Sequence, residues 1–531
     1  EQNSTRPETV SPDVLKTPLA CATDIFSLPG KRVLHKIVTS DPSLNVTVTQ
    51  LPDGLTWNAK RRVVEGTAPE AEGVYHYNIV STEGKEQQVL AKATLTVKKN
   101  LPLAKPMMGW ISWNVVQDKI STDVVKKVSD AMVKQGLKDV GYNYLIIDDL
   151  WHAKTRHSDG RPQEDPAKFP IGMKATVDYA HSKGLKFGIY SDAANNTCAG
   201  AFGSYGKETV DAKQYAAWGV DLLKYDYCHA PSDAASAQVR YKAMGDALKQ
   251  SGRDILLYMC EWGAREPWKW GFTTGSPVWR ATYDTRDGWN GKQGGIGIIQ
   301  SIASMKDLWA YSGVNRFNDA DMMCVGIHGT GKSSNDLVVG TPGMTQDEYR
   351  TQFALWCMWS SPLLLSFDLT KPITADDKKL MTNADLIALD QDDLGQQAEY
   401  IGTVDNMVYF MKDLANGDVA ISATNMNEAT KEAVFDFSKF SALDPTVDYY
   451  IYDCQLQKAG ENTVKAMLRT PVRKHATVVF RLGRNKITGI STVSAQKHKK
   501  TIVNFDLSGR KVEHPTAGQL VISEGNKQLT L

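Results

Sequence analysis

The stretch Leu222-Leu223-Lys224-Tyr225-Asp226 carries the pattern that decides the fold: a short apolar run that ends on a carboxylate. Runs of this kind recur between about residues 107 and 368, and segments with helical spacing separate them. Such alternation predicts parallel βα units. Eight strands are expected, which is the number in a (β/α)₈ barrel. They span residues 107–113, 144–149, 186–191, 222–226, 255–261, 278–284, 314–319 and 362–368.

The segment between the first two strands indicates how the intervening helices begin and end. Thr122 is of a type that caps helix N-termini, and Gly141 is of the type that follows a helix end. Between them, apolar residues recur at helical spacing. They are Val124, Val125, Val128, Met132 and Leu137. The sequence therefore predicts a helix that starts at Thr122 and stops at Gly141.

Changes in this pattern divide the chain of 531 residues into four predicted regions. They are an immunoglobulin-like β-domain at 1–101, the TIM barrel at 106–395, an antiparallel β-sandwich at 396–484, and a short β-rich tail module at 485–531. In the first region, apolar residues alternate at 46–48, 74–80 and 89–97, with turn signals at 52–54 and 83–84. In the third, strands are expected at 408–411, 419–423, 449–452 and 476–482.

The two end regions also resemble known modules. Residues 51–57, 64–69 and 73–75 are similar to the Ig-like domains appended to bacterial secreted enzymes. Such a domain serves either as a spacer or as a separate binding unit, and both readings stay open. Residues 505–512 resemble short C-terminal modules of secreted bacterial proteins. The alternative for this tail is a strand-forming segment packed on the sandwich.

The composition restricts the classes of function. The net charge is +1, so no electrostatic footprint for nucleic acid or an anionic membrane is expected. No apolar run is long enough to span a membrane. The seven cysteines are too few for a disulfide scaffold, and no Cys-x-x-Cys or His-Glu-x-x-His motif offers a zinc site. The 13 tryptophans and 20 tyrosines suit a protein that stacks on sugar rings.

Charged residues, together with one tryptophan, stand where the predicted barrel strands end. The set comprises Trp113, Asp148, Asp149, Asp192, Lys224, Asp226, Glu261, Arg280, Asp284, Asp319, Asp321 and Asp368. The active site of a (β/α)₈ barrel lies at this end of its strands. Carboxylates crowded into one cavity repel one another, so some must be paired with a cation or hydrogen-bonded. Lys224 and Arg280 are the cations available.

Three chemistries fit such a ring of acids. Two carboxylates can cleave a glycosidic bond in a polyhydroxylated sugar. A hard divalent cation held by oxygen ligands is a second option, although no histidine accompanies the acids. A Schiff-base aldolase that uses Lys224 is the third. Its phosphorylated substrates would be repelled by the acidic sequences at 316–322 and 366–368, so glycoside hydrolysis is favoured.

The strand ends resemble glycoside hydrolase family 27, which includes the α-galactosidases (melibiases). The matching blocks lie in order at 108–114 (MGWISWN), 148–151 (DDLW), 169–174 (FPIGMK), 181–190 (HSKGLKFGIY), 197–200 (TCAG), 218–221 (WGVD), 224–228 (KYDYC), 260–263 (CEWG) and 318–322 (NDADM). Together they cover residues 106–480, including the β-sandwich that follows the barrel in this family. The resemblance implies exo-acting, retaining hydrolysis of terminal α-linked D-galactose from an oligosaccharide or glycan, without a cofactor or metal.

The resemblance also implies roles for individual residues. Asp226 matches the family nucleophile and Asp284 the acid/base. The implied substrate-binding residues are Trp113, Asp148, Asp149, Tyr190, Cys198, Lys224, Glu261, Trp262, Arg280, Asp321 and Met322. Cys198 and Cys228 match a family disulfide beside the pocket. Glu261 and Tyr190 are equally open to a structural role, and Asp192 and Asp319 are expected to hold neighbouring loops.

Departures from the family pattern leave rival activities open. Leu150 stands where many relatives have cysteine, and Ala320 replaces a frequent proline. Residues 262–267 are closer to the galactosidase pattern than to that of an α-N-acetylgalactosaminidase. A β-L-arabinopyranosidase is the nearest rival, because its sugar is galactose without the hydroxymethyl group. A non-catalytic carbohydrate-binding protein is the rival from another class.

The expected location follows from the same resemblance. The chain begins at Glu1 rather than Met, so a leader was removed or the N-terminus was trimmed. A disulfide beside the pocket fits an oxidising compartment. The expectation is a secreted, periplasmic or cell-surface bacterial protein. The oligomeric state does not follow from the sequence.

Overall fold

The computed structural model describes residues 18–82, 87–291, 294–330 and 342–490, and strands within 504–529. Residues up to Ser491 form one compact unit and residues from Thr492 a second, which is a four-stranded sheet in the order β26-β25-β27-β28. These strands are β25 Asn504–Phe505, β26 Lys511–Val512, β27 Leu520–Ser523 and β28 Asn526–Leu529. The turn expected at 83–84 and most of the tail expected at 485–531 lie outside the described residues.

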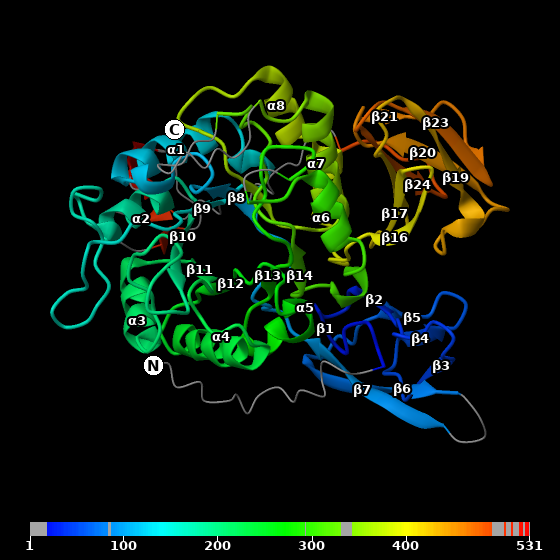
Figure 1. Ribbon diagram of the computed structural model, residues 1–531, viewed down its shortest axis with the longest axis horizontal. Helices are drawn as coiled ribbons and strands as arrows, with labels where there is room; N and C mark the ends of the chain where they lie inside the picture. Colours follow the sequence, from blue (N-terminus) through cyan, green and yellow to red (C-terminus); the bar gives the residue numbers. More distant parts are fainter. Residues whose placement is uncertain are drawn as a thin grey trace. The chain divides into compact units, whose positions relative to one another are not determined.

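A parallel eight-stranded sheet forms the centre of the first unit (Figure 1). Its order is β14-β13-β12-β11-β10-β9-β8-β15, and a parallel bridge between Met323 and Leu365 joins its two ends into a barrel. The strands are β8 Met108–Ile111, β9 Tyr144–Ile146, β10 Lys186–Asp192, β11 Leu222–Asp226, β12 Leu256–Met259, β13 Val278–Arg280, β14 Phe317–Asp319 and β15 Leu363–Leu365. All eight predicted strands are present, and the (β/α)₈ prediction is confirmed.

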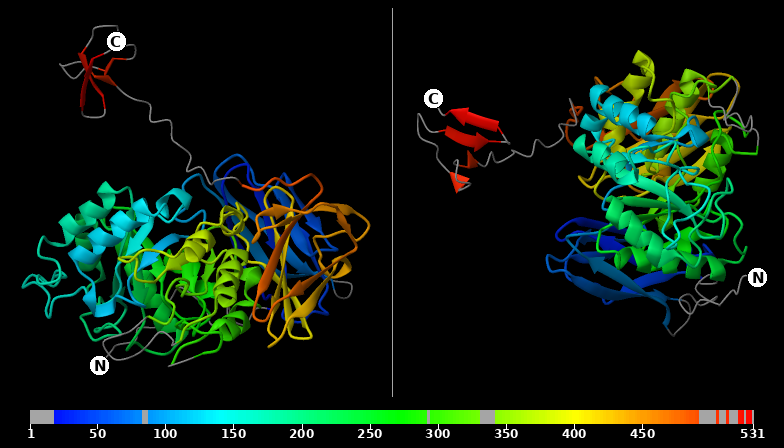
Figure 2. Two further views of the ribbon diagram at one scale, coloured as in Figure 1. Left: turned by 90° about the horizontal axis from the view of Figure 1, so that it is seen from above. Right: turned by 90° about the vertical axis from the view of Figure 1, so that its left-hand side faces the viewer.

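Helices surround the outside of these strands (Figure 2). They are α1 Thr122–Lys134, α2 Met173–Ser182, α3 Glu208–Trp218, α4 Ala234–Lys249, α5 Pro267–Trp270, α6 Ile298–Met305, α7 Gln346–Met358, α8 Ala375–Met381 and α9 Ala384–Asp390. Among the residues that the structure describes, no helix has the length and apolar character needed to cross a bilayer.

The alternation of side chains along the strands creates two apolar cores. In β11, Leu222 belongs to the cluster inside the barrel, whereas Leu223 and Tyr225 belong to the cluster between sheet and helices. Because strand side chains alternate with a period of two, Lys224 and Asp226 share the inward face with Leu222. Apolar residues therefore fill the barrel interior until the strand ends, where polar side chains replace them.

The first helix differs from the prediction at both ends. Ser121, not Thr122, is the N-cap: its side chain accepts a hydrogen bond from the backbone N–H of Val124 at 3.3 Å. The Thr122 hydroxyl instead hydrogen-bonds that of Thr176 on α2. The helix ends at Lys134, and a separate 3₁₀ turn precedes Gly141, whose φ of +114° lies in the left-handed region. Gly141 therefore ends the turn and not the helix.

Two β-domains flank the barrel in the chain. The N-terminal one has the sheets β1-β7-β6-β3 and β2-β5-β4, built from β1 Asp24–Ser27, β2 Arg32–Lys36, β3 Val46–Thr49, β4 Leu55–Asn58, β5 Val63–Thr67, β6 Gly73–Ser81 and β7 Gln88–Val97. The C-terminal one has the sheet β16-β17-β18-β24-β20-β21, with β22 beside β20, and the pair β19-β23. Its strands are β16 Glu399–Val404, β17 Met407–Asp413, β18 Val419–Asn425, β19 Lys431–Asp436, β20 Asp448–Asp453, β21 Lys458–Ala459, β22 Val464–Lys465, β23 Met467–Val472 and β24 Thr477–Gly483. Both match the predicted β-sandwich classes.

Candidate active site

The carboxyl ends of β9, β10 and β11 bring one group of acidic residues together. In the parallel register of β10 and β11, Tyr190 lies opposite Lys224 and Asp192 opposite Asp226. Asp148 and Asp149 follow the end of β9, which pairs with β10 on its other side. Parallel pairing places all these strand ends at the same mouth of the barrel, as the fold requires.

Asp226 is the most constrained carboxylate of this group. Its Oδ2 accepts a hydrogen bond from the Tyr190 hydroxyl at 2.8 Å. Its Oδ1 accepts bonds from the Trp262 indole N–H at 3.1 Å and from the Tyr227 backbone N–H at 2.9 Å. Trp262 has a φ of +59°, so its left-handed backbone turns the indole toward Asp226 at a conformational cost. Donors on both oxygens fix the carboxylate and favour its charged form.

A buried ion pair lies beside it. Lys224 Nζ donates to Asp148 Oδ2 at 2.6 Å, and both side chains are 4% exposed. Asp148 in turn accepts a bond from the Asp149 backbone N–H at 2.8 Å. Asp149 accepts bonds from the backbone N–H of Ala199 at 2.9 Å and from the Thr197 side chain. Burial raises the pKa of Asp149 to about 6, because these donors only partly compensate for lost hydration.

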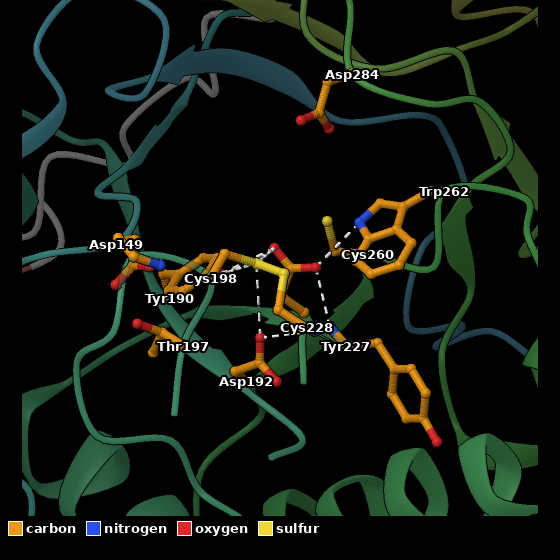
Figure 3. Close-up of a disulfide and its surroundings, with 12 residues drawn as sticks. Asp149, Tyr190, Asp192, Thr197, Cys198, Tyr227, Cys228, Cys260, Trp262 and Asp284 are labelled. Atoms are coloured by element: carbon orange, nitrogen blue, oxygen red, sulfur yellow. Dashed lines mark hydrogen bonds between the residues drawn. A yellow bond between two sulfur atoms is a disulfide. The ribbon is translucent and has the colours of Figure 1, made fainter. Parts of the chain in front are cut away.

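The opposite side of the site is organised by Arg280 at the end of β13. Its Nη2 lies 3.0 Å from Asp284 Oδ1, and its Nε lies 3.1 Å from Asp321 Oδ1. Asp321 also accepts the Thr285 backbone N–H at 2.8 Å. The Asp284 side chain is 41% exposed, so it faces the opening. In Figure 3 its carboxylate points toward the side on which Trp262, Cys260 and the disulfide lie.

Burial and neighbouring charges act on the pKa of Asp284 in opposite directions. Burial raises the pKa of this carboxyl, but the Arg280 and Arg286 guanidinium groups outweigh it and hold the pKa below its ordinary value. Because the Asp284 side chain is 41% exposed, solvent screens the two guanidinium charges and also weakens the effect of burial on its pKa. Asp284 is therefore ionised at neutral pH.

Asp192 and Asp226 titrate as a pair. Burial raises the pKa of both, while the Lys224 charge opposes the rise at Asp226. Asp192 has a pKa raised to about 9 by burial and by the Asp226 charge. Its Oδ2 accepts the Cys228 backbone N–H at 3.0 Å, and its Oδ1 has no hydrogen-bond partner among the described residues. Asp226 has three donors, so the shared proton resides on Asp192 and Asp226 is ionised.

The predicted disulfide between Cys198 and Cys228 is formed. Cys198 is exposed at the rim, and its Sγ lies 3.3 Å from Asp226 Oδ2 (Figure 3). The other five cysteines are buried free thiols. Among the described residues, the His, Cys, Asp and Glu side chains close enough to share a metal ion are Asp192, Cys198, Asp226 and Cys228. With the two sulfurs bonded to each other, this set does not offer four metal ligands.

Some residues predicted at the site lie differently. Glu261 is fully buried, and both of its oxygens accept bonds from Arg265, so its carboxylate does not face the opening. Asp319, which was expected to hold a neighbouring loop and not to contact substrate, is enclosed and accepts a hydrogen bond from the Tyr258 hydroxyl. Asp368 pairs with Lys371 at 3.1 Å and with Thr370, outside the ring of acids.

Two predicted apolar contacts belong to the core inside the barrel. Met322 is buried in that cluster, and the half-buried Trp113 packs against it. Both therefore lie beneath the polar groups at the strand ends, where an apolar face of a sugar ring would meet carbon and not water.

Three polar neighbours were not predicted from the sequence. Thr197 donates to Asp149, Thr285 fixes Asp321, and the Cys260 thiol lies 3.4 Å from Arg280 Nη1. Thr197 and Cys260 lie within the family-like blocks 197–200 and 260–263, so the sequence indicated that both lie near the site. Thr285 follows Asp284 in an irregular segment, and no sequence pattern indicates its contact.

Comparison with known proteins identifies the family. The family described as Alpha galactosidase A matches residues 105–392, and an Ig-domain family matches residues 21–98. Alpha-galactosidase A of Cellvibrio japonicus is 36% identical over 413 residues, which are 75% of this chain and 97% of the relative.

Solved structures have the same fold. A structure from Bacteroides fragilis covers 88% of this chain and 97% of its own, with a TM-score of 0.68 and 33% identity. α-Galactosidase I from Mortierella vinacea covers 73% and 99%, with a TM-score of 0.67 and 30% identity. The chain therefore belongs to the α-galactosidase family, glycoside hydrolase family 27, and carries an N-terminal Ig-like domain.

Proposed function

We propose that this enzyme hydrolyses terminal α-linked D-galactose from oligosaccharides or glycans by a double displacement that retains the anomeric configuration. The observation that carries the proposal is a pair of carboxylates in opposite environments. Asp226 is buried and held by three donors, whereas Asp284 is 41% exposed and paired with Arg280. A retaining glycosidase needs one carboxylate as the nucleophile and a second one that donates and accepts a proton.

In the first step Asp226 attacks the anomeric carbon and Asp284 protonates the glycosidic oxygen. The bond to the leaving alcohol breaks, and a galactosyl ester forms on Asp226. In the second step Asp284 takes a proton from water, and the water oxygen attacks the anomeric carbon. Galactose leaves, the Asp226 carboxylate is restored, and Asp284 is protonated for the next cycle.

The remaining polar groups supply recognition. Asp148 and Asp149 accept hydrogen bonds from the 4- and 6-hydroxyls, with Lys224 as donor beside them. A sugar with either hydroxyl misplaced leaves a buried carboxylate without its partner, which costs affinity. Arg280 and Asp321 bind the 2-hydroxyl side. The apolar boundary consists of Trp113, Tyr190, Cys198, Trp262 and Met322. Glu261 acts indirectly, by holding Arg265 and the Trp262 segment.

A β-L-arabinopyranosidase is the alternative within the same family. That sugar lacks the hydroxymethyl group, so its enzyme gains from a bulkier group that fills the space. Here both acids at 148 and 149 are the shorter Asp, which leaves room for the hydroxymethyl group. This difference favours galactose.

The test is a proton NMR time course with an aryl α-D-galactopyranoside, with the aryl β-L-arabinopyranoside run in parallel. The expected result is that α-galactose appears first and then mutarotates. If β-galactose appears first, the enzyme inverts, and the pairing of Asp226 with Asp284 is wrong. If only the arabinoside is cleaved, the assignment of Asp148 and Asp149 is wrong.

We also propose an oxidising location, outside the cytoplasm. The solvent-exposed disulfide beside the nucleophile supports it, because such a bond is reduced in a glutathione-buffered compartment. Fractionation of the native host, with activity measured in the medium, periplasm and cytoplasm, tests this location. Activity confined to the cytoplasm would contradict it.

A further inference from the structure

The Cys198–Cys228 disulfide lies directly against two carboxylates. Ligand atoms of Asp192, Cys198, Asp226 and Cys228 all lie within 4.8 Å of one another. Cys198 Sγ is 3.3 Å from Asp226 Oδ2 and 3.7 Å from Asp192 Oδ2. Figure 3 shows Asp192 below the disulfide, on the side away from Asp284. Four potential ligands therefore converge from strand β10, strand β11 and the segments that follow them.

We propose that reduction of this disulfide opens a site for a thiophilic divalent cation such as Zn²⁺, and that the bound ion inactivates the enzyme by ligating Asp226. Two thiolates and two carboxylates form a donor set that suits zinc and not magnesium or calcium. Tetrahedral zinc binds sulfur at about 2.3 Å and carboxylate oxygen at about 2.0–2.2 Å. Ligand atoms on such a centre lie about 3–4 Å apart, within the spread that the four side chains already have.

The sulfurs are accessible and remain in place when the bond opens. Cys198 is exposed and Cys228 half-buried, so a small reductant reaches them from solvent. The segment around Cys198 is held independently by the bond from Ala199 N–H to Asp149 Oδ2 at 2.9 Å, and by that from Thr197 N–H to the Ala201 carbonyl. The Cys228 backbone is held by Asp192 at 3.0 Å.

Asp192 is the ligand that the catalytic reaction does not use. It is fully buried, and its Oδ1 lacks a hydrogen-bond partner among the described residues. An uncompensated buried carboxyl oxygen costs free energy. The other oxygen, Oδ2, faces the cluster at 3.7 Å from Cys198 Sγ, and a cation bound there between Asp192 and Asp226 removes the repulsion between the two acids.

The chemistry balances with a named reductant. A small dithiol gives its two electrons and two protons to the disulfide and becomes a cyclic disulfide; a phosphine gives two electrons and becomes its oxide, and one water molecule supplies the oxygen and the two thiol protons. Metal binding then releases both thiol protons, and the proton on Asp192, to solvent. Neither step transfers electrons to the metal. The bound ion occupies Asp226 Oδ2, so the carboxylate cannot attack a sugar.

The first experiment uses Co²⁺ as a spectroscopic probe on the full chain, after reduction with a phosphine and removal of the excess without oxygen. Sulfur-to-cobalt charge-transfer absorption and tetrahedral d–d bands are expected to saturate at one equivalent in the reduced enzyme. The oxidised enzyme is expected to show neither. This readout does not require activity, so failure of the metal site is distinguishable from failure of the proposed function.

The second experiment measures hydrolysis. Zn²⁺ at micromolar concentration is expected to lower the activity of the reduced enzyme at least tenfold, and EDTA to restore it. The oxidised enzyme is expected to keep its activity at the same Zn²⁺ concentration. Equal inhibition of both forms, or no charge-transfer band in the reduced enzyme, would overturn the proposal.

Matched variants separate this site from the five buried thiols. Cys198→Ser with Cys228→Ser is expected to abolish the cobalt band and the zinc sensitivity. Asp192→Asn keeps the disulfide and is expected to weaken Zn²⁺ binding by the reduced enzyme at least tenfold. If the double variant does not fold, Asp192→Asn still tests the site, because unchanged zinc affinity in that variant contradicts it. Alkylation of the reduced enzyme with iodoacetamide is a further test, and a cobalt band that survives this treatment also contradicts the site.

Discussion

The two sides of the active site handle carboxylates in opposite ways. On the side of β9, β10 and β11, Asp149 and Asp226 are enclosed, and burial raises the pKa of each. On the side of β13 and β14, Arg280 contacts both Asp284 and Asp321, and the pKa of Asp284 is lowered. The neighbouring groups, and not the residue type, therefore determine the protonation state of these chemically identical side chains.

This division has a consequence for the reaction. In the proposed mechanism Asp284 donates a proton in the first step, although the Arg280 and Arg286 charges favour its ionised form. Only a small fraction of free enzyme at neutral pH then carries both the ionised Asp226 and the protonated Asp284. The activity is accordingly expected to be highest at acidic pH.

The largest effect is expected from replacing Asp226, on the buried side of the site. Asp226→Asn removes the nucleophile and is expected to lower kcat by about 10⁴-fold, while galactose binding measured by calorimetry persists. Asp192→Asn is the matched control, since Asp192 lies opposite Asp226 in the strand register and does not touch the reacting atoms. Turnover of Asp226→Asn within tenfold of the unchanged enzyme would show that another group attacks.

The second-largest effect is expected from replacing Asp284, on the exposed side of the site. Asp284→Asn is expected to lower kcat/KM by about 10²–10⁴-fold for a natural disaccharide, whose leaving alcohol needs a proton. For a dinitrophenyl galactoside, which leaves without protonation, the first step is expected to be nearly unaffected. Pre-steady-state release of the phenolate measures this step. An equal loss on both substrates would contradict the assignment of Asp284.

The third prediction concerns the pH dependence of the reaction when Arg280 is replaced. Arg280→Gln removes the cation that depresses the pKa of Asp284, so that pKa rises and the protonated acid persists to higher pH. Arg280 also holds down the pKa of Asp226, so both limbs of the kcat/KM profile are expected to move to higher pH, the acidic limb with Asp284 and the alkaline limb with Asp226, by about one pH unit each. The rate itself falls, because Arg280 also contacts Asp321. A limb that stays in place, or moves downward, contradicts the argument.

The smallest expected effect concerns stability. Asp192 has a folded pKa of about 9 and an ordinary value of 3.8, so the folded state binds more protons between these values. Its contribution to stability is present at low pH and is lost as pH rises toward 9. Asp192→Asn cannot ionise, so its stability relative to the unchanged enzyme is expected to increase with pH between 5 and 8, by at most about 1.4 kcal/mol per pH unit. Thermal unfolding at both pH values measures it; a difference independent of pH would contradict the protonated Asp192.

Much of the fold followed from local pattern. The strands expected at 144–149 and 222–226 begin at the predicted residues, because a short apolar run before a carboxylate is a local signal. The end of α1 was wrong by several residues. Gly136 and Gly141 both adopt left-handed backbones, and only packing shows that the chain leaves the helix before the first of them.

For the site, the sequence indicated which residues stand at strand ends but not what they touch. Glu261 and Asp368 end their predicted strands as Asp226 does, yet both lie beyond the observed strands, where Arg265 and Lys371 pair with them. These partners lie within four residues, but pairing depends on loop conformation that no spacing specifies. The catalytic roles of Asp226 and Asp284 stay predictions until the variants are measured.

The number of strands, the class of chemistry and the candidates at each strand end can all be predicted from the chain's local pattern, because alternation and residue type are local properties. Only the tertiary structure decided which of those acids are ionised. Protonation depends on burial and on charges brought close from distant strands, such as Asp148 beside Lys224, which are 76 residues apart. Local sequence does not contain that distance, because it arises when eight strands close into one barrel.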